Sequence, residues 1–173
     1  MWRTTTFLEI QDLVTQGMPE IQGFDLFNGQ LESYRGDNNE HDYLDPPFVL
    51  LELVGGDWEH DGELRIAEEY FIRLYYVCEE YRESNKQSTQ QADAIAHLDK
   101  VSELANLLDL ENLSFMTKIE FVREEIDTSY TNIVSHVLDF VGRVTDDSLQ
   151  QLKAPAKVNV TQHQTQGFFV PKR

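Results

Sequence analysis

Two short runs place a histidine among carboxylates, an arrangement that could bind a divalent metal. They lie at residues 40–42 (Glu-His-Asp) and 57–62 (Asp-Trp-Glu-His-Asp-Gly). Hard cations prefer carboxylate oxygens, so Asp57, His60 and Asp61 could serve a metal-dependent hydrolase. Neither run follows the EF-hand pattern, and no His-x-x-x-His or Cys-x-x-Cys pair supplies further ligands. We therefore expect solvated acidic turns with no metal and no cofactor, and the hydrolase stays a remote alternative.

Other catalytic patterns are missing from the sequence as well. It has no nucleophile elbow, no P-loop and no dinucleotide-binding glycine fingerprint. Adjacent carboxylates such as Glu68 and Glu69 point to opposite faces of a strand and cannot share a substrate. Cys78, the single cysteine, lies in an apolar run typical of a buried thiol, and we expect His97 and His136 to be structural or interfacial. These features predict a protein that is not an enzyme.

Charge is distributed very unevenly along the chain. Residues 1–148 hold all 31 acidic residues and ten of the 14 basic ones, a formal charge of −21. Residues 149–173 carry +4 and include an aromatic pair; the residues concerned are Lys153, Lys157, Phe168, Phe169, Lys172 and Arg173. Opposite charges attract within one chain or between neighbours. We expect this extended C-terminal arm to dock on an acidic groove with apolar borders.

Composition limits the class of protein. A chain of 173 residues with 40% hydrophobic content can bury a core, which predicts a single domain over residues 1–148 followed by the arm. The net charge of −17 opposes nonspecific binding to nucleic acid or anionic lipid. The N-terminus does not read as a signal peptide, and no apolar run approaches the roughly 20 residues of a membrane span. We expect a soluble protein made in the cytoplasm.

The first half of the sequence predicts a helix followed by strands. Thr6 and Glu9 form a capping box, so a helix should begin at Thr6 and stop near Gly17. Residues 23–32 predict a short strand or part of a hairpin, and residues 33–45 an exposed, mobile polar loop. The apolar run at residues 48–54 predicts a strand that ends in a glycine turn.

Residues 63–80 predict one long strand. Apolar residues occupy the even positions from Leu64 to Cys78, the period of a strand with one buried face. Phe71 and Tyr75 make the centre of the odd face apolar too. A run of this length should bend at a bulge or project as a hairpin. Two covers for the odd face stay open: the chain's own helices and arm, or a neighbouring subunit.

The second half predicts a helix and a pair of strands. A second capping box at residues 88–91 precedes a helical stripe that extends to Leu108. Phe115, Thr117, Ile119 and Phe121 should share one face of the next strand, opposite Glu124. The last strand should place residues 134, 136, 138, 140 and 144 on one face, after a charged hairpin connection over residues 124–132. The whole predicts an α+β domain with two main helices and a mostly antiparallel sheet of four to five strands.

This order of elements resembles the tail terminator and tail completion proteins of long-tailed bacteriophages. The likeness consists of the N-terminal helix (residues 6–16), the strand after Pro46 and Pro47 with its long hairpin (46–80), the helix 91–108 and the final strand pair (115–144). It covers about 140 residues and is one of layout and length. The insert at residues 33–45 and the arm depart from it.

The resemblance implies a homo-oligomeric ring, commonly of six subunits, that caps the tail tube and meets the head connector. DNA would pass through such a ring without being specifically bound, and the protein would be part of the virion tail or neck. The arm would then dock on a neighbouring subunit or neck protein. Another neck or connector component and a monomeric cellular adaptor remain as alternatives.

Overall fold

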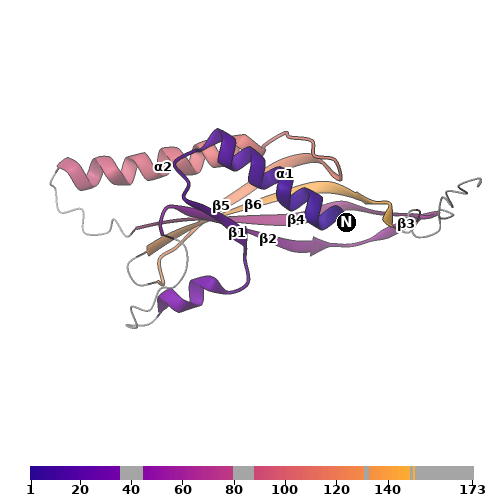
Figure 1. Ribbon diagram of the computed structural model, residues 1–173, viewed down its shortest axis with the longest axis horizontal. Coiled ribbons are helices and arrows are strands. Elements are labelled where there is room, and N and C mark those ends of the chain that lie inside the picture. The colour runs from indigo at the N-terminus through magenta and orange to yellow at the C-terminus, as the bar shows by residue number, and fades with distance from the viewer. Residues whose placement is uncertain (36–44, 80–87, 131–132, 149, 151–173) are drawn as a thin grey trace, which may run out of the picture.

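The computed structural model describes residues 1–35, 45–79, 88–130, 133–148 and 150. In this part of the chain two helices lie on one face of a six-stranded sheet, which confirms the α+β class (Figure 1). The elements are α1 (Trp2–Gly17), β1 (Gly23–Leu26), the 3₁₀ helix η1 (Gln30–Arg35), β2 (Phe48–Gly56), β3 (Glu59–Asp61), β4 (Leu64–Glu79), α2 (Ser88–Leu108), β5 (Met116–Asp127) and β6 (Ile133–Asp146). Their order across the sheet is β1-β2-β4-β6-β5, and β3 pairs with β4.

Helix α1 begins four residues earlier than the sequence pattern predicts. Its N-cap is Met1, which makes no side-chain capping bond, and Thr6 is buried inside the helix. The predicted capping box is therefore wrong. Burial of Trp2 accounts for the early start, because its ring packs edge-on against Tyr70 with centroids 5.1 Å apart and also contacts Trp58. The predicted stop near Gly17 is confirmed.

The segment after α1 departs from the predicted hairpin and loop. Strand β1 pairs with β2 in parallel, from Gly23 opposite Phe48 to Leu26 opposite Leu51, and all other strand pairs are antiparallel. Residues 30–35 form η1, whose Leu31 and Tyr34 are buried, so the start of the predicted exposed loop is wrong. The remainder of that loop, residues 36–44, lies outside the described residues.

Strand β4 is the centre of the sheet and confirms the long predicted strand. It pairs with β2 and β3 on one side and with β6 on the other. A bulge between Ala67 and Tyr70 shifts the alternation of side chains by one position. Ala67 is therefore buried on the face that Tyr70 and Ile72 occupy, and Leu64 and Ile66 do not belong to the predicted even-numbered face.

Helix α2 packs on the sheet through its C-terminal half. Val101, Leu104 and Leu108 are buried, whereas Ile95 and Leu98 are exposed. In Figure 1 the N-terminal part of α2 extends past the end of the sheet. The helix does begin at Ser88, although the side chains of residues 88–91, which carry the predicted capping box, lie outside the described part.

Strands β5 and β6 confirm the predicted final pair, with one correction. The alternation predicted for β6 holds, since Val134, Leu138, Phe140 and Val144 all join the core below the helices. In β5, register shifts at Thr117/Glu120 and Phe121/Arg123 interrupt the alternation. Phe121 and Glu124 pair with Phe140 and Leu138, so they share a face. Strand β5 also continues to Asp127, inside the predicted connection; residues 131–132 are not described.

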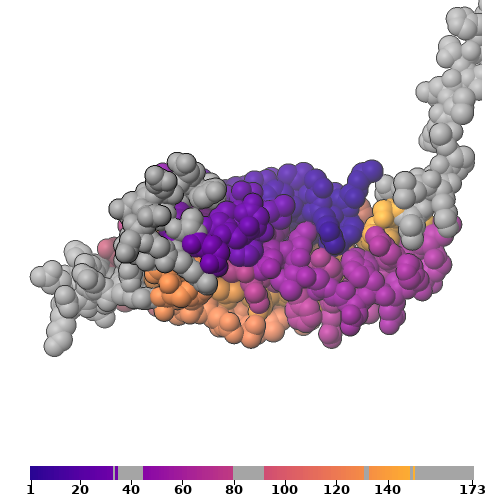
Figure 2. Space-filling model, turned by 90° about the horizontal axis from the view of Figure 1, so that it is seen from below, coloured from indigo at the N-terminus to yellow at the C-terminus, as the bar shows by residue number. Residues whose placement is uncertain are grey.

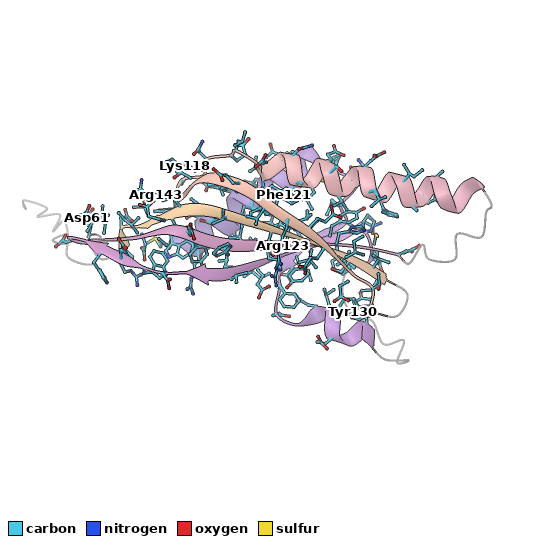
Figure 3. All side chains as sticks on the ribbon, turned by 180° about the vertical axis from the view of Figure 1, so that it is seen from behind. Asp61, Lys118, Phe121, Arg123, Tyr130 and Arg143 are labelled. Atoms are coloured by element: carbon cyan, nitrogen blue, oxygen red, sulfur yellow. The ribbon has the colours of Figure 1, made fainter. Side chains whose placement is uncertain are left out.

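Apolar side chains form two clusters on opposite sides of the sheet. The larger lies between the sheet and both helices and contains Tyr70, Ile72, Leu74 and Phe140. The smaller lies under η1 and contains Leu31, Tyr34, Phe48, Tyr75 and Tyr130, among others. Figure 3 shows Tyr130 beside η1, on the side away from α2. Within the described ranges, no helix is long and apolar enough to cross a membrane.

Candidate interaction surface

The helices leave much of one sheet face uncovered. We call the face opposite α1 and α2 the open face; near its middle it presents Glu52 of β2, Phe71 and Arg73 of β4, Asp139 of β6 and Arg123 of β5. Figure 2 views the molecule from this side, where strands reach the surface over much of the view and η1 covers one part. In Figure 3, Arg123 lies on this side and Phe121 on the side of α2.

Alternating charges cross the open face from β2 to β5. Arg73 lies between two acids, with its Nε 2.6 Å from Oδ1 of Asp139 and its Nη1 3.7 Å from Oε2 of Glu52. Arg123 donates from Nε to the other oxygen of Asp139, at 2.7 Å, and its Nη1 lies 2.9 Å from Oε1 of Glu125. We call Glu52, Arg73, Asp139, Arg123 and Glu125 the charged ladder. It links four neighbouring strands through side chains.

Asp139 is the centre of the charged ladder. Burial raises the pKa of its carboxyl, but hydrogen bonds from Arg73 and Arg123 outweigh burial and hold that pKa below its usual value. Its partner Arg73 has a raised pKa, chiefly because of the hydrogen bond to Asp139. Because the pKa of the acid is lowered and the pKa of the base is raised, both Asp139 and Arg73 are charged at neutral pH. The ladder is thus a fixed pattern of charge on the sheet.

The two aromatic residues predicted for the odd face of β4 have different environments. Phe71 is 39% exposed, and Val54 of the neighbouring strand is 50% exposed. The ring of Tyr75 instead stacks on Phe27, with centroids 4.5 Å apart, and its hydroxyl donates to Glu52 at 2.6 Å. Burial and this hydrogen bond raise the pKa of Tyr75 to about 12. The chain's own residues therefore cover Tyr75, while Phe71 remains available for contact.

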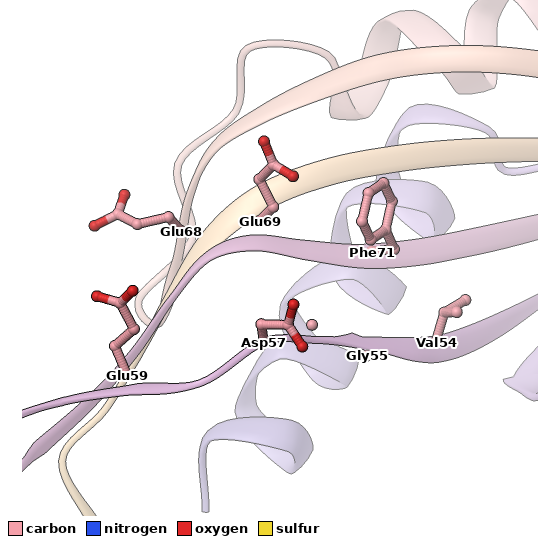
Figure 4. A pocket seen from close by; sticks show the side chains of 8 residues that line it. Val54, Gly55, Asp57, Glu59, Glu68, Glu69 and Phe71 are labelled. Carbon is pink, nitrogen blue, oxygen red and sulfur yellow. The ribbon is translucent and has the colours of Figure 1, made fainter.

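An acidic cavity of about 560 Å³ lies where β2 and β4 become irregular. Its carboxylates are Asp57, Glu59, Glu68 and Glu69, and Phe71 and Val54 form its apolar border. Glu68 and Glu69 both line this cavity because they lie at the bulge in β4, so the prediction that they cannot share a site is wrong. Figure 4 shows Glu69, Phe71 and Val54 projecting toward the same side of the two strands. Such a concentration of negative charge repels phosphate groups and attracts basic segments.

The hydrolase alternative relies on residues in strand β3 and just before it. His60 and Asp61 lie on β3 and are exposed, and Asp57 precedes that strand. In the parts of the chain that the structure describes, no three His, Cys, Asp or Glu side chains converge so as to hold a metal ion. The acidic run around His41 lies outside those parts.

The two histidines predicted to be structural or interfacial, His97 and His136, both lie beside the ring of Tyr76. His136 is buried, and its Nδ1 lies 2.9 Å from Oε1 of Glu124. Nδ1 of His97 is 2.9 Å from the hydroxyl of Tyr76. Burial lowers the pKa of His97, and the nearby His136 lowers it further, although Asp93 and Glu79 act in the opposite direction. His97 is therefore a neutral hydrogen-bonding partner that joins α2 to β4.

This arrangement predicts a loss of stability on mild acidification. Because the pKa of His97 is lower in the folded state, the unfolded chain takes up the proton first. The free energy of unfolding should therefore fall as the pH drops below the ordinary histidine value of about 6.5. Urea unfolding between pH 7.5 and 5.5 measures this, and His97→Gln should flatten the dependence. His60→Gln, at an exposed site, is the control; an unchanged slope in His97→Gln contradicts the prediction.

Sequence reasoning missed the charged ladder, although a signal for it was present. Glu52, Arg73 and Asp139 each interrupt an apolar strand, and a lone charge at such a position requires a partner. Partners on different strands could not be paired without the register. The other predicted interaction residues, Lys153, Lys157, Phe168, Phe169, Lys172 and Arg173, lie outside the described residues.

Comparisons with known proteins do not assign a family. No family model matches this sequence, and no curated protein matches it either.

Proposed function

We propose that this protein is a structural subunit of a long-tailed bacteriophage, acting as the tail terminator that caps the tail tube and joins it to the head connector. The observation that carries this proposal is the one-sided cover of the sheet. Both helices lie on one face, and the open face retains exposed Phe71 and Val54 beside a fixed pattern of charge. A surface of this kind suits contact with another protein.

A second copy of the chain is the partner that the proposal requires. The charged ladder contains both signs, and its charges already satisfy one another within the subunit. Such a surface can approach another subunit without leaving an isolated charge buried. Closed rings of identical subunits are a common outcome of such contacts.

Overall charge supports the proposed passage of DNA. The chain carries −17, and four carboxylates gather in the acidic cavity. A ring lined by such surfaces does not hold phosphate groups, because like charges repel over the screening length of about 8–10 Å. This property favours a conduit in the virion neck over a nucleic-acid-binding protein.

Self-association through the open face can be measured directly. We expect light scattering over a concentration series to show oligomers, and electron microscopy to show rings. Phe71→Glu should raise the dissociation constant at least tenfold, because it places an additional charge in the apolar part of the contact. Ile95→Glu is the matched control, since Ile95 is 52% exposed on α2. A chain that stays monomeric at tens of micromolar contradicts the proposed ring and favours an adaptor.

The arm should contribute to assembly as well. We expect the double substitution Phe168→Ala and Phe169→Ala to weaken association, since a fully buried aromatic side chain contributes roughly 1.5–3 kcal/mol. Neutralising the four basic residues of the arm should mainly slow association and reduce its dependence on salt. Scattering and stopped-flow mixing measure the two effects. Unchanged assembly in the double variant shows that the aromatic pair has no docking role.

A further inference from the structure

Strand β1 ends while its neighbour continues, and a groove begins at that point. Leu26 is the last residue of β1, opposite Leu51, whereas β2 extends to Gly56. A cavity of about 590 Å³ lies between α1 and this outer part of β2. Its apolar lining includes Phe7, Leu26, Phe27, Leu53 and Trp58, and Glu52 adds a carboxylate. The groove therefore occupies the place that a longer β1 would fill.

The floor of the groove offers backbone hydrogen-bonding groups. The N–H of Phe27 donates to the carbonyl of Leu51 at 2.8 Å, so the groups of Leu51 point away from β4. In an antiparallel pair, residues two apart have the same orientation, and Leu53 pairs with Ile72 in the same register. By this alternation the N–H and C=O of Leu53 face the groove, two residues beyond the last residue that pairs with β1. An edge of this kind accepts an added strand.

The C-terminal arm has the chemistry that this groove selects. Residues 157–161 read Lys-Val-Asn-Val-Thr, an alternation typical of a strand with one apolar face. The arm carries +4, and the groove shares Val54, Gly55 and Gly56 with the acidic cavity. Apolar side chains can therefore enter the groove while lysines lie near carboxylates.

The direction of β6 favours the arm of a neighbouring copy. Strands β2 and β6 are both antiparallel to β4, so they run parallel to each other. Asp146, near the end of β6, lies opposite Arg65, whereas the groove floor at Leu53 lies opposite Ile72. The chain thus leaves the sheet beyond the groove and directed away from it. Ten residues separate Asp146 from residue 157, and at about 3.3 Å each when extended they carry the arm up to about 33 Å outward, toward another subunit.

We propose that residues 157–161 of one copy add as a strand to the outer edge of β2 in the next copy. This inference rests on the proposed self-association and assigns the acceptor site of the arm. It makes the ring contact heterologous, because a groove on one subunit receives a segment of another.

Disulfide trapping in the full-length chain tests this contact. Val54→Cys places a thiol on an exposed position of β2, and a second cysteine is placed in turn at each residue from 157 to 161. Adjacent strands lie about 4.8 Å apart, within reach of a disulfide. The native Cys78 does not interfere, because burial raises its pKa to about 12 and keeps it a thiol. Ile95→Cys with the same arm cysteines is the matched control.

The expected result is a series of covalent multimers. Their yield should alternate with period two along residues 157–161 and should exceed the yield of the control at least fivefold. A linked species that remains a monomer overturns the assignment to a neighbouring copy. A yield no higher than that of the control overturns the groove as acceptor. Light scattering on the same samples separates the two proposals: an oligomer without trapping leaves the proposed function standing, whereas a monomer without trapping contradicts both.

Discussion

Replacing Asp139 with alanine should lower the free energy of unfolding by about 3 kcal/mol. The Asp139 side chain is 12% exposed and accepts hydrogen bonds from both Arg73 and Arg123. Its removal deprives both guanidinium groups of their shared partner, and the Arg73 side chain is only 29% exposed. Breaking a buried ion pair costs about 3–5 kcal/mol, and the partial exposure of both arginines places this case at the lower end. Urea unfolding provides the measurement.

Two further variants separate the buried charge from the rest of the ladder. Glu125→Ala removes an exposed end of the same ladder and should cost less than about 0.5 kcal/mol. The double substitution Arg73→Met and Asp139→Leu should recover part of the loss, since no buried charge then lacks a partner. An Asp139→Ala variant as stable as the wild type would show that the ladder has no structural role.

The same residue predicts a change in acid unfolding. The pKa of Asp139 is lower in the folded state, so the unfolded chain takes up the proton first as the pH falls. Its contribution to stability is fully present above the ordinary carboxyl pKa of about 3.9 and is lost as the pH falls from there through the lower pKa of the folded state. The unfolding free energy of Asp139→Ala should therefore depend less on pH below about 5.

Replacing Gly56 with alanine should cost about 3 kcal/mol and open the end of the β2–β4 pair. A Cβ atom at this position would lie 2.2 Å from the carbonyl oxygen of Glu69 and 2.9 Å from Cα of Tyr70. Both are backbone atoms at the bulge, which cannot rotate away as a side chain can. Overpacking a fixed structure costs about 1–3 kcal/mol, and separation of the strands adds to this. Thermal unfolding and near-ultraviolet circular dichroism of the Trp2, Trp58 and Tyr70 cluster measure the effect.

Gly62→Ala is the matched control for this substitution. Gly62 has a φ of 63°, and a Cβ there would meet no atom within 4 Å. Its cost is that of a left-handed backbone conformation, about 1–2 kcal/mol, without any clash. A Gly56→Ala variant no less stable than Gly62→Ala would show that the two strands can move apart freely at the bulge.

The sequence contained enough information for the class of the fold and most of its elements. The alternation of β6 and of the centre of β4 reflects the face that packs against the helices, and the stripe on α2 reflects burial of Val101, Leu104 and Leu108. These patterns are local, since a side chain's face follows from its own position in a regular element. The resemblance to tail terminators and the docking of the arm stay predictions, because they concern partners of the chain.

What the sequence by itself determined, then, is the set of regular elements and the imbalance of charge between body and arm. Tertiary structure decided where that regularity is broken. The bulge after Ala67 moved Leu64 and Ile66 off the predicted face, and the packing of Trp2 on Tyr70 overrode the capping signal at Thr6. It also brought Arg73 and Asp139 together across 66 residues and, in the described part of the chain, left the outer edge of β2 beyond Leu26 without a neighbouring strand. The physical reason is that register and edge pairing depend on contacts between distant segments, and local periodicity does not contain them.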